Sequence, residues 1–394
     1  MRIAYVTADP GVPVFGRKGC TVHVQALVRA FRHLGHTVEV FTTRLGGPVP
    51  AEFADLRVHL LPVARASAER PPAVAALGIN HHLRCALQAQ GPFDLVYERY
   101  SLWSYAGMDW AARAGVPSLL EVNAPLIAEA AAHRGALDAA TAERVARAAF
   151  GRAGALVAVS AGVAEYLAGF AGAAERTVVV PNAVEPTRFP LGLAPAWAPP
   201  PGSFTIGFLG TLKPWHGVPV LLRALAELAR FHEDCHVLLV GDGPERERLE
   251  AQAAELGLAD RVHFAGAVAP EDVPAWLAAM DVAVAPYEDL TGFYFSPLKV
   301  YEYMAAGLPV VASAVGELRT LVRHECTGFT VAAGDVLALA SALAQLRLDH
   351  DLRRRLGANG RAVVLREHTW SQAATRVLAA ARPGLRPGVP TEAR

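Results

Sequence analysis

Short runs of β-branched and other apolar residues alternate with amphipathic helical stretches along most of this chain. In the first half, the predicted strands are Ile3–Thr7, Val38–Thr42, Asp94–Tyr97, Ser118–Val122, Leu156–Val159 and Val178–Val180. The stretch Val22–Leu34 is a typical helix between two of them, and it is followed by Gly35, a residue that commonly ends helices. Apolar strands separated by helices indicate a parallel sheet that is covered on both faces.

This alternation stops between residues 188 and 202, where proline is frequent and no apolar period remains. A second series follows, and its predicted strands are Thr205–Leu209, His236–Val240, Val262–Ala265, Val282–Ala285 and Pro309–Ser313. We therefore predict two doubly wound α/β domains, residues 1–188 and 203–369, with ligands bound where the carboxyl ends of the strands face a shared cleft. Residues 383–394 are predicted to form a loose tail.

Composition limits the classes of partner. The chain has 394 residues, of which 53% are hydrophobic, enough for two cores. Its 37 basic residues balance 37 acidic ones, so we expect no nucleic-acid partner. It contains no apolar run long enough to cross a bilayer, and its four cysteines are scattered, as is typical of reduced thiols. These features predict a cytoplasmic protein that associates with membranes peripherally at most, for which the arginine-containing helical stretch 138–152 is a candidate.

The strongest chemical signal lies in the segment FYFSPLKVYEYMAAGLPVV. Ser296 suits the N-cap of a helix, and Pro297 suits its first position because proline has no N–H to leave unpaired there. The N–H groups of Leu298 and Lys299 would then point out of a positively polarised helix end. Together with the Lys299 ammonium they suit a diphosphate. The ordinary alternative is a helix start with a solvated lysine and glutamate.

Glu302 lies one turn further along this helix, where a carboxylate can accept hydrogen bonds from two ribose hydroxyls. The segment resembles the donor-binding helix of glycosyltransferase family 4, which reads roughly E-x7-E-A-M-A-x-G-x-P-V. The matching positions are Glu302, Met304, Ala305, Gly307, Pro309 and Val310. Tyr294 replaces the first glutamate of the pattern, the residue that usually contacts the donor sugar. The form S-P-L-K-x-x-E-Y-M-A is similar to one branch of the family, and the departure at Tyr294 leaves the donor sugar open.

A second segment, FLGTLKPWHG, joins a predicted strand to a helix and includes Gly210. The family usually has an arginine and a lysine here that neutralise the diphosphate. Thr211 stands at the arginine position and His216 at the lysine position, with Lys213 between them. We interpret Lys213 as the permanent cation and His216 as a phosphate donor of variable charge. In isolation, both would usually be ordinary surface residues.

Two further segments are similar to nucleotide-binding loops of the family. In LLVGDGP, Gly241 serves the geometry of the turn first, and Asp242 is either a turn residue or a nucleotide contact. In VHFAGAV, we expect Val268 to contact the base through its backbone.

In the first predicted domain, the loop ADPGVPVFGRKGC follows the first strand. Gly16 and Gly19 allow close backbone approach just before a helix begins. Their spacing is not G-x-G-x-x-G, which disfavours an NAD enzyme. The loop resembles the family's glycine loop near the donor diphosphate and the acceptor. Asn123 follows another strand, where many members carry a histidine, and we expect it to contact sugar hydroxyls; satisfying the local backbone is the alternative.

The resemblance covers nearly the whole chain and implies the GT-B fold, with a helix at 370–382 returning to the first domain. It implies a retaining glycosyltransferase that moves a hexose-type sugar from a UDP- or GDP-sugar to a small-molecule, glycan or lipid-linked acceptor, without a cofactor or metal ion. Lys213, Lys299 and Asn123 are then the expected catalytic residues, with the lysines stabilising the leaving diphosphate. Two alternatives stay open: a nucleotide-sugar hydrolase or epimerase of the same fold, and a non-catalytic nucleotide-sugar binder.

Overall fold

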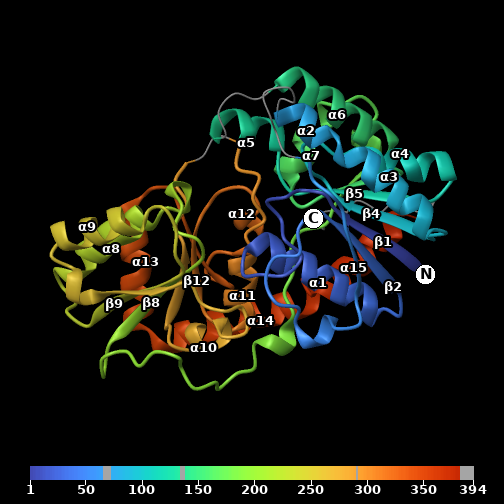
Figure 1. Cartoon of the computed structure of the whole chain (residues 1–394). Helices are drawn as coiled ribbons and strands as arrows, with labels where there is room; N and C mark the ends of the chain where they lie inside the picture. Colours follow the sequence, from blue (N-terminus) through green and yellow to red (C-terminus); the bar gives the residue numbers. More distant parts are fainter. Residues whose placement is uncertain (65–71, 134–137, 290–291, 382–394) are drawn as a thin grey trace, which may run out of the picture. The chain divides into compact units, whose positions relative to one another are not determined.

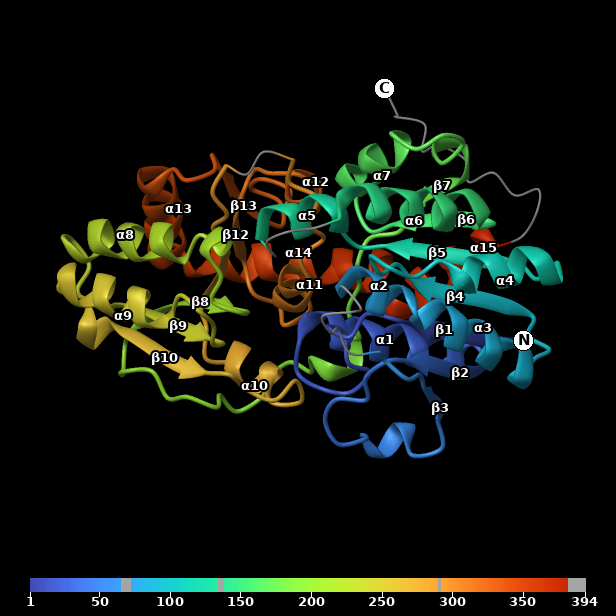
Figure 2. The same cartoon turned by 45° about the horizontal axis from the view of Figure 1, so that its top comes forward.

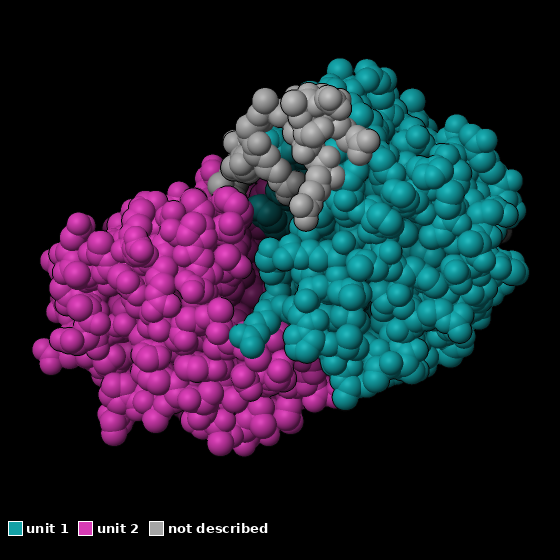
Figure 3. Space-filling view, viewed as in Figure 1, with its two compact units in different colours: residues 1–181, 294–296, 370–394 teal, residues 182–293, 297–369 magenta. Residues whose placement is uncertain are grey.

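The computed structural model describes residues 1–64, 72–133, 138–289 and 292–381, so the predicted tail lies outside the described residues. Contacts between residues divide the chain into two compact units, which Figure 3 colours separately. Unit 1 comprises Met1–Pro181, Tyr294–Ser296 and the residues from Trp370 onward, whereas unit 2 comprises Asn182–Phe293 and Pro297–Thr369.

Unit 1 contains a seven-stranded sheet in the order β3-β2-β1-β4-β5-β6-β7, with every neighbouring pair parallel. Its strands are β1 (Arg2–Thr7), β2 (Thr37–Thr42), β3 (Arg57–Leu60), β4 (Leu95–Arg99), β5 (Ser118–Val122), β6 (Ala155–Ala158) and β7 (Thr177–Val179). Strand β3 was not predicted. This edge strand has no buried side chain and therefore lacks the apolar run of the central strands.

Helices cover both faces of this sheet (Figures 1 and 2). They are α1 (Gly19–His33), α2 (Pro72–Leu77), α3 (Ile79–Gln90), α4 (Ala106–Ala114), α5 (Leu126–His133), α6 (Ala139–Arg152), α7 (Ala161–Ala168) and α15 (Trp370–Ala380). Helix α1 packs against α15, and α4 packs against both α3 and α6. The final helix of the chain therefore belongs to the same unit as the first strand.

Unit 2 contains a six-stranded sheet in the order β10-β9-β8-β11-β12-β13, again parallel throughout. Its strands are β8 (Phe204–Leu209), β9 (Cys235–Val240), β10 (Val262–Gly266), β11 (Val282–Ala285), β12 (Val310–Ser313) and β13 (Gly328–Val331). Its helices are α8 (Val218–Ala229), α9 (Arg246–Glu255), α10 (Val273–Leu277), α11 (Leu298–Ala305), α12 (Leu318–Leu321), α13 (Val336–Leu348) and α14 (His350–Glu367). Strand β13 was not predicted, because it is a short edge strand that begins with glycine.

Both sheets reverse their strand order beside their first strand. The reversal lies between β1 and β4 in unit 1 and between β8 and β11 in unit 2. In open α/β sheets, ligands bind outside the carboxyl ends of the strands at such a reversal. The predicted class of two Rossmann-like domains with parallel sheets is confirmed. The topology also directs the search for a site to the residues that follow β1, β4, β8 and β11.

The segment after Phe189 has no helix or strand until β8 begins, and it packs against other parts of unit 2. The N–H of Ala196 donates to the carbonyl oxygen of Ala275, 2.9 Å away. The Trp197 ring stacks on His263 with centroids 5.0 Å apart, and His263 in turn stacks on Trp276.

Candidate functional site

Two glycine-containing loops of unit 2 lie backbone against backbone where β8 and β9 end. The N–H of Gly210 donates to the Val240 carbonyl at 2.9 Å, and the N–H of Leu212 donates to that of Asp242 at 3.0 Å. A Cβ added to Gly241 would lie 2.0 Å from the Gly210 carbonyl oxygen, and the φ of Gly241 is +141°. Only glycine fits there, which agrees with the turn role that the sequence analysis placed first.

The side chain of Lys299 reaches from α11 to the end of β8. It is 8% exposed, and its Nζ lies 4.0 Å from the centroid of the Phe208 ring. A Cβ on Gly210 would come within 2.9 Å of this Nζ. Among the described residues, none accepts a hydrogen bond from the Lys299 ammonium. Burial lowers the pKa of Lys299 to about 7, although Glu302 opposes the shift. A buried ammonium without a partner is unfavourable, so this position suits an anionic ligand.

Helix α11 begins one residue later than the sequence analysis predicted. Its N-cap is Pro297, with extended backbone at φ −77° and ψ 108°, and its first helical residue is Leu298. The predictions of Ser296 as the N-cap and of Pro297 as the first helical residue are therefore wrong. Ser296 lies outside the cap position, and proline has no side-chain acceptor to take its place. The first N–H groups of the helix are still those of Leu298 and Lys299, which precede the bond from Val300 N–H to the Pro297 carbonyl.

His216 ends a short 3-10 turn that follows β8. Its Nδ1 lies 2.5 Å from the Thr211 carbonyl oxygen, and because a carbonyl only accepts, Nδ1 carries the hydrogen. Burial, together with the charge of Lys299 and then that of Lys213, lowers the pKa of His216 to about 3. The ring is therefore neutral and Nε2 bears a lone pair. The predicted role of phosphate donor requires a proton on Nε2 that the neutral ring lacks.

Glu302 and Lys213 interact with Lys299 and His216 respectively through their charges. Burial raises the pKa of Glu302 to about 7, although the charges of Arg188 and Lys299 oppose the shift. The Nζ of Lys213 lies 5.5 Å from the centroid of the Trp215 ring, and the lysine side chain is half-buried. The Lys213 ammonium thus lies against an aromatic face of its own loop.

The loops after β9 and β10 contain the residues predicted to lie near the nucleotide. Asp242 is exposed, and its Oδ1 accepts from the N–H of Gly243 at 2.8 Å, so it acts in the turn. Val268 is half-buried. Arg246, which the sequence analysis did not select, lies over the Phe264 ring at 5.7 Å and 4.0 Å from Asp242. Its position depends on the pairing of β9 with β10, which no local pattern in the sequence reveals.

In unit 1, Asn123 belongs to a largely buried polar cluster at the ends of β4 and β5. Arg99 donates to its Oδ1 and lies 3.6 Å from Glu121, and His23 Nε2 lies 2.7 Å from Glu121 Oε1. Burial alone would raise the pKa of Glu121. However, the charge and hydrogen bond of His23, the charge of Arg99 and the amide of Asn123 lower it to about 2. Sequence reasoning missed His23 because it lies on α1, far from Asn123 in sequence.

The other predicted residues of unit 1 lie in different surroundings. Gly16 has φ +150°, a conformation that favours glycine, and Gly19 is the exposed first residue of α1. The hydroxyl of Tyr294 donates to Glu129, and its carbonyl accepts from Ser160 Oγ at 2.6 Å. The Tyr294 hydroxyl is therefore engaged within unit 1.

The structure brings together one coherent group of predicted residues, all in unit 2, at the ends of β8, β9 and α11. They are Gly210, Thr211, Lys213, His216, Gly241, Asp242, Pro297, Leu298, Lys299 and Glu302. We take this group as the candidate site. A group of three or more potential metal ligands is absent from the described ranges, and none of the helices described is long and apolar enough to cross a membrane.

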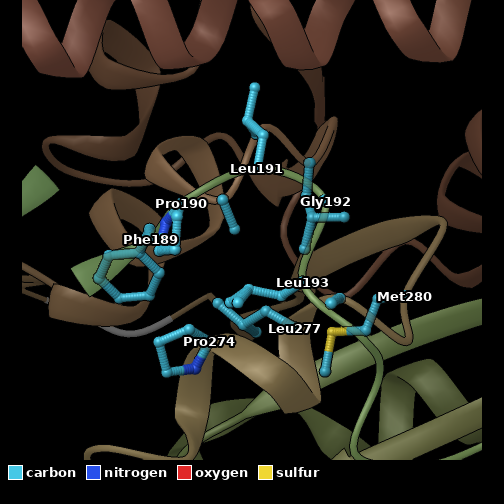
Figure 4. A pocket seen from close by; sticks show the side chains of 11 residues that line it. Phe189, Pro190, Leu191, Gly192, Leu193, Pro274, Leu277 and Met280 are labelled. Atoms are coloured by element: carbon cyan, nitrogen blue, oxygen red, sulfur yellow. The ribbon is translucent and has the colours of Figure 1, made fainter. Parts of the chain in front are cut away.

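A separate pocket of about 260 Å³ in unit 2 contains none of these residues (Figure 4). The segment Phe189–Leu193 forms one side, and residues of α10 and those after α11, such as Leu277 and Leu308, form the other. It adjoins the end of α11 opposite to Lys299 and is therefore outside the candidate site.

Two Rossmann-like units with parallel sheets form the architecture of the GT-B fold. Residues 203–349 match the family described as glycosyl transferases group 1, and residues 18–183 match the glycosyl transferase 4-like domain. The 2-deoxystreptamine glucosyltransferase of Streptomyces kanamyceticus is 31% identical over 345 residues, covering 81% of this chain and 87% of that protein. A D-inositol 3-phosphate glycosyltransferase of Stackebrandtia nassauensis is 30% identical over 390 residues, covering 92% and 86% respectively. The chain therefore belongs to the glycosyltransferase family that combines these two domains.

Solved structures agree at the level of the fold. Sucrose-phosphate synthase from Thermosynechococcus elongatus has a TM-score of 0.75 at 24% identity, covering 95% of this chain and 96% of its own. HepE from Anabaena in complex with UDP and glucose has a TM-score of 0.72 at 19% identity, covering 95% and 98%. The predictions of a GT-B fold and of a glycosyltransferase are confirmed.

Proposed function

We propose that this protein is a retaining glycosyltransferase whose unit 2 binds a nucleoside diphosphate hexose at the end of β8. The observation that carries the proposal is the Lys299 ammonium, which is buried at the start of α11 and has no hydrogen-bond acceptor in the described part of the chain. A helix N-terminus is positively polarised and leaves its first N–H groups unpaired, so the two features together suit a diphosphate.

The chemistry follows from the charge that develops on the leaving group. The bond between the anomeric carbon and the diphosphate oxygen breaks, and the acceptor oxygen bonds to the same face of the sugar. The acceptor proton passes to the departing diphosphate. Lys299, Lys213 and the first N–H groups of α11 stabilise the developing charge, the kind of preorganised electrostatic contribution that dominates in many enzymes. This scheme uses no metal ion and no cofactor.

The donor base and the sugar are proposed more broadly, as a UDP- or GDP-hexose. Relatives support both bases. HepE has been solved in complex with UDP-glucose, and a mannosyltransferase of Mycobacterium tuberculosis, 33% identical over 179 residues, is described as GDP-mannose-dependent. Tyr294 stands in place of the family's sugar-binding glutamate, so we assign no particular hexose.

For the acceptor, we propose a polyhydroxylated small molecule, glycan or lipid-linked sugar. The acceptors named for two relatives, 2-deoxystreptamine and D-inositol 3-phosphate, both carry a hydroxylated carbon ring. In unit 1, Asn123 follows β5 in the polar cluster with Arg99 and Glu121. We assign it to an acceptor or sugar hydroxyl. The proposed setting is the cytoplasm, with peripheral membrane association at most.

The test begins with a thermal-shift screen of UDP, GDP and ADP and of their hexose conjugates, since a bound ligand stabilises the folded state by mass action. With the donor identified, Lys299→Ala should lower turnover on the order of a hundredfold or more, as loss of a partner for transition-state charge does. Arg230→Ala is the matched control, because Arg230 is exposed and pairs only with Glu227 among the described residues. Near-normal turnover of folded Lys299→Ala would overturn the assignment.

Free sugar released without an acceptor would indicate a hydrolase, and binding without turnover would indicate a non-catalytic binder.

A further inference from the structure

His216 stands where the family usually has a lysine, and its hydrogen bonding differs from that of a lysine ammonium. Its only hydrogen-bond partner among the described residues is the Thr211 carbonyl, on Nδ1. The ring is half-buried and makes an edge contact with Tyr287, with centroids 5.9 Å apart. Nε2 therefore carries the lone pair of the neutral ring and repels a phosphate oxygen.

The alternative tautomer does not solve this difficulty. If the hydrogen moved to Nε2, the Nδ1 lone pair would lie 2.5 Å from the Thr211 carbonyl oxygen. Two acceptors would then face each other in a partly desolvated place, and a hydrogen bond would be lost. Only the imidazolium can keep the bond to Thr211 and also donate to a phosphate.

The charged groups around the ring explain why the imidazolium needs an anion. Lys299 faces it from α11 and Lys213 from its own loop, and both disfavour a further positive charge. Glu302 faces Lys299 from one turn along α11, and Arg188 faces Glu302. Tyr287 and Phe208 contribute neutral rings from the ends of β11 and β8. A diphosphate placed against the two lysines offsets their positive charge, so that it no longer disfavours the imidazolium.

We propose that the diphosphate of the donor binds together with one proton from solvent, which is held on Nε2 of His216. The inference rests on the proposed function and adds its regulation by pH. The incoming proton bonds to the Nε2 lone pair, and the new N–H donates to a phosphate oxygen. When the nucleoside diphosphate leaves, the proton returns to solvent. A titrating side chain thus replaces the permanent cation, and donor affinity falls as the pH rises.

Isothermal titration calorimetry tests this coupling directly. UDP-glucose and GDP-mannose are the probes, because neither has a terminal phosphate that titrates near neutral pH. The dependence of the observed binding enthalpy on the ionisation enthalpy of the buffer gives the number of protons taken up. Lys299 and Glu302 also change protonation on binding. The informative quantity is therefore the difference in proton uptake between the wild type and two variants, His216→Lys and His216→Gln.

The wild type should take up about one proton more than either variant. Its dissociation constant should increase with pH by up to about tenfold per unit, and that of His216→Lys should change less. His216→Gln should bind the donor about tenfold more weakly at acidic pH, because a charge-assisted hydrogen bond is lost. Equal proton uptake in all three proteins would overturn the inference. Failure of the wild type to bind either probe would instead count against the proposed function.

A measurement on the unaltered protein guards against variants that misfold. With 15N-labelled histidine, nuclear magnetic resonance distinguishes the neutral ring from the imidazolium. The His216 signals should change from the neutral to the doubly protonated form on addition of the bound probe. A ring that stays neutral in the complex would contradict the inference.

Discussion

At the scale of single residues, burial controls charge in the candidate site. It lowers the pKa of Lys299 and raises that of Glu302, so both come to about 7, one turn apart on α11. A different part of the ligand then favours the charged form of each group. The lysine suits a phosphate, and the carboxylate suits ribose hydroxyls.

Glu302→Ala tests the ribose role. We expect it to weaken nucleoside diphosphate binding at least about tenfold, because hydrogen bonds to a charged acceptor contribute roughly 1.5–3 kcal/mol each. The matched control is a nucleoside diphosphate whose ribose lacks both hydroxyls. The wild type should bind this ligand about as weakly as Glu302→Ala binds the ribose ligand. The variant should bind the two ligands with similar affinity. Titration calorimetry gives both values. If Glu302→Ala and the wild type had the same dissociation constant for the ribose ligand, the carboxylate would have no such contact.

Glu98 shows the effect of burial outside the candidate site. It is 1% exposed at the end of β4, and Ser104 Oγ donates to it at 2.5 Å. Burial raises the pKa of Glu98 to about 7 from 4.5, although Ser104 and the Met108 N–H oppose the shift. Between these values the folded protein binds a proton that the unfolded chain has lost. The free energy of unfolding must therefore decrease as the pH rises from about 4.5 to about 7.

Glu98→Gln removes that dependence because the amide stays neutral. Relative to the variant, the wild type should lose up to about 3 kcal/mol as the pH rises through this window, at roughly 1.4 kcal/mol per pKa unit. Urea unfolding at several pH values measures the difference. Glu227→Gln, which removes a partly exposed carboxylate paired with Arg230, should show no comparable trend. A difference between wild type and Glu98→Gln that does not vary with pH would contradict the argument.

At the scale of elements, the glycine loops depend on close backbone approach. Gly241→Ala would place a Cβ 2.0 Å from the Gly210 carbonyl at φ +141°, so the loop that carries Lys213 and His216 must move. We expect a loss of unfolding free energy of more than about 2 kcal/mol together with loss of donor binding. Gly257→Ala is the control, since Gly257 has φ +71° with nothing within 4 Å and should cost only about 1 kcal/mol. Equal costs at the two positions would show that φ alone matters.

The elements also show what the sequence could and could not predict. Central strands such as β5 and β11 were predicted at their observed bounds, because both are buried throughout and mostly apolar. The edge strands β3 and β13 lack that signal. The helix at the diphosphate site was predicted from its Ser-Pro start and lysine, but its cap was misplaced by one residue. The group of His23, Arg99 and Glu121 was missed because it forms between elements, where spacing in the sequence carries no information.

At the scale of the whole molecule, each unit has its own apolar core. That of unit 1 includes residues of β1, β4 and α3, whereas those of unit 2 lie on the two faces of its sheet. Helix α15 joins the last described part of the chain to the unit that contains the first strand. Trp370, the first residue of α15, is 5% exposed and makes an edge contact with the His23 ring, with centroids 5.0 Å apart. Stability of the first unit therefore depends on residues at the far end of the sequence.

Trp370→Ala should destabilise unit 1 by about 3–5 kcal/mol, as truncation of a buried tryptophan does. Hydrogen exchange followed peptide by peptide locates the effect: exchange in β1 and α1 should accelerate, and exchange in β8 and β9 should change little. Trp276→Ala is the mirror-image variant, because Trp276 is half-buried in unit 2 against His263, and it should accelerate exchange in α10 and β10 instead. If either substitution accelerated hydrogen exchange equally in both units, the chain would unfold as one cooperative body. The two cores would then not differ in stability.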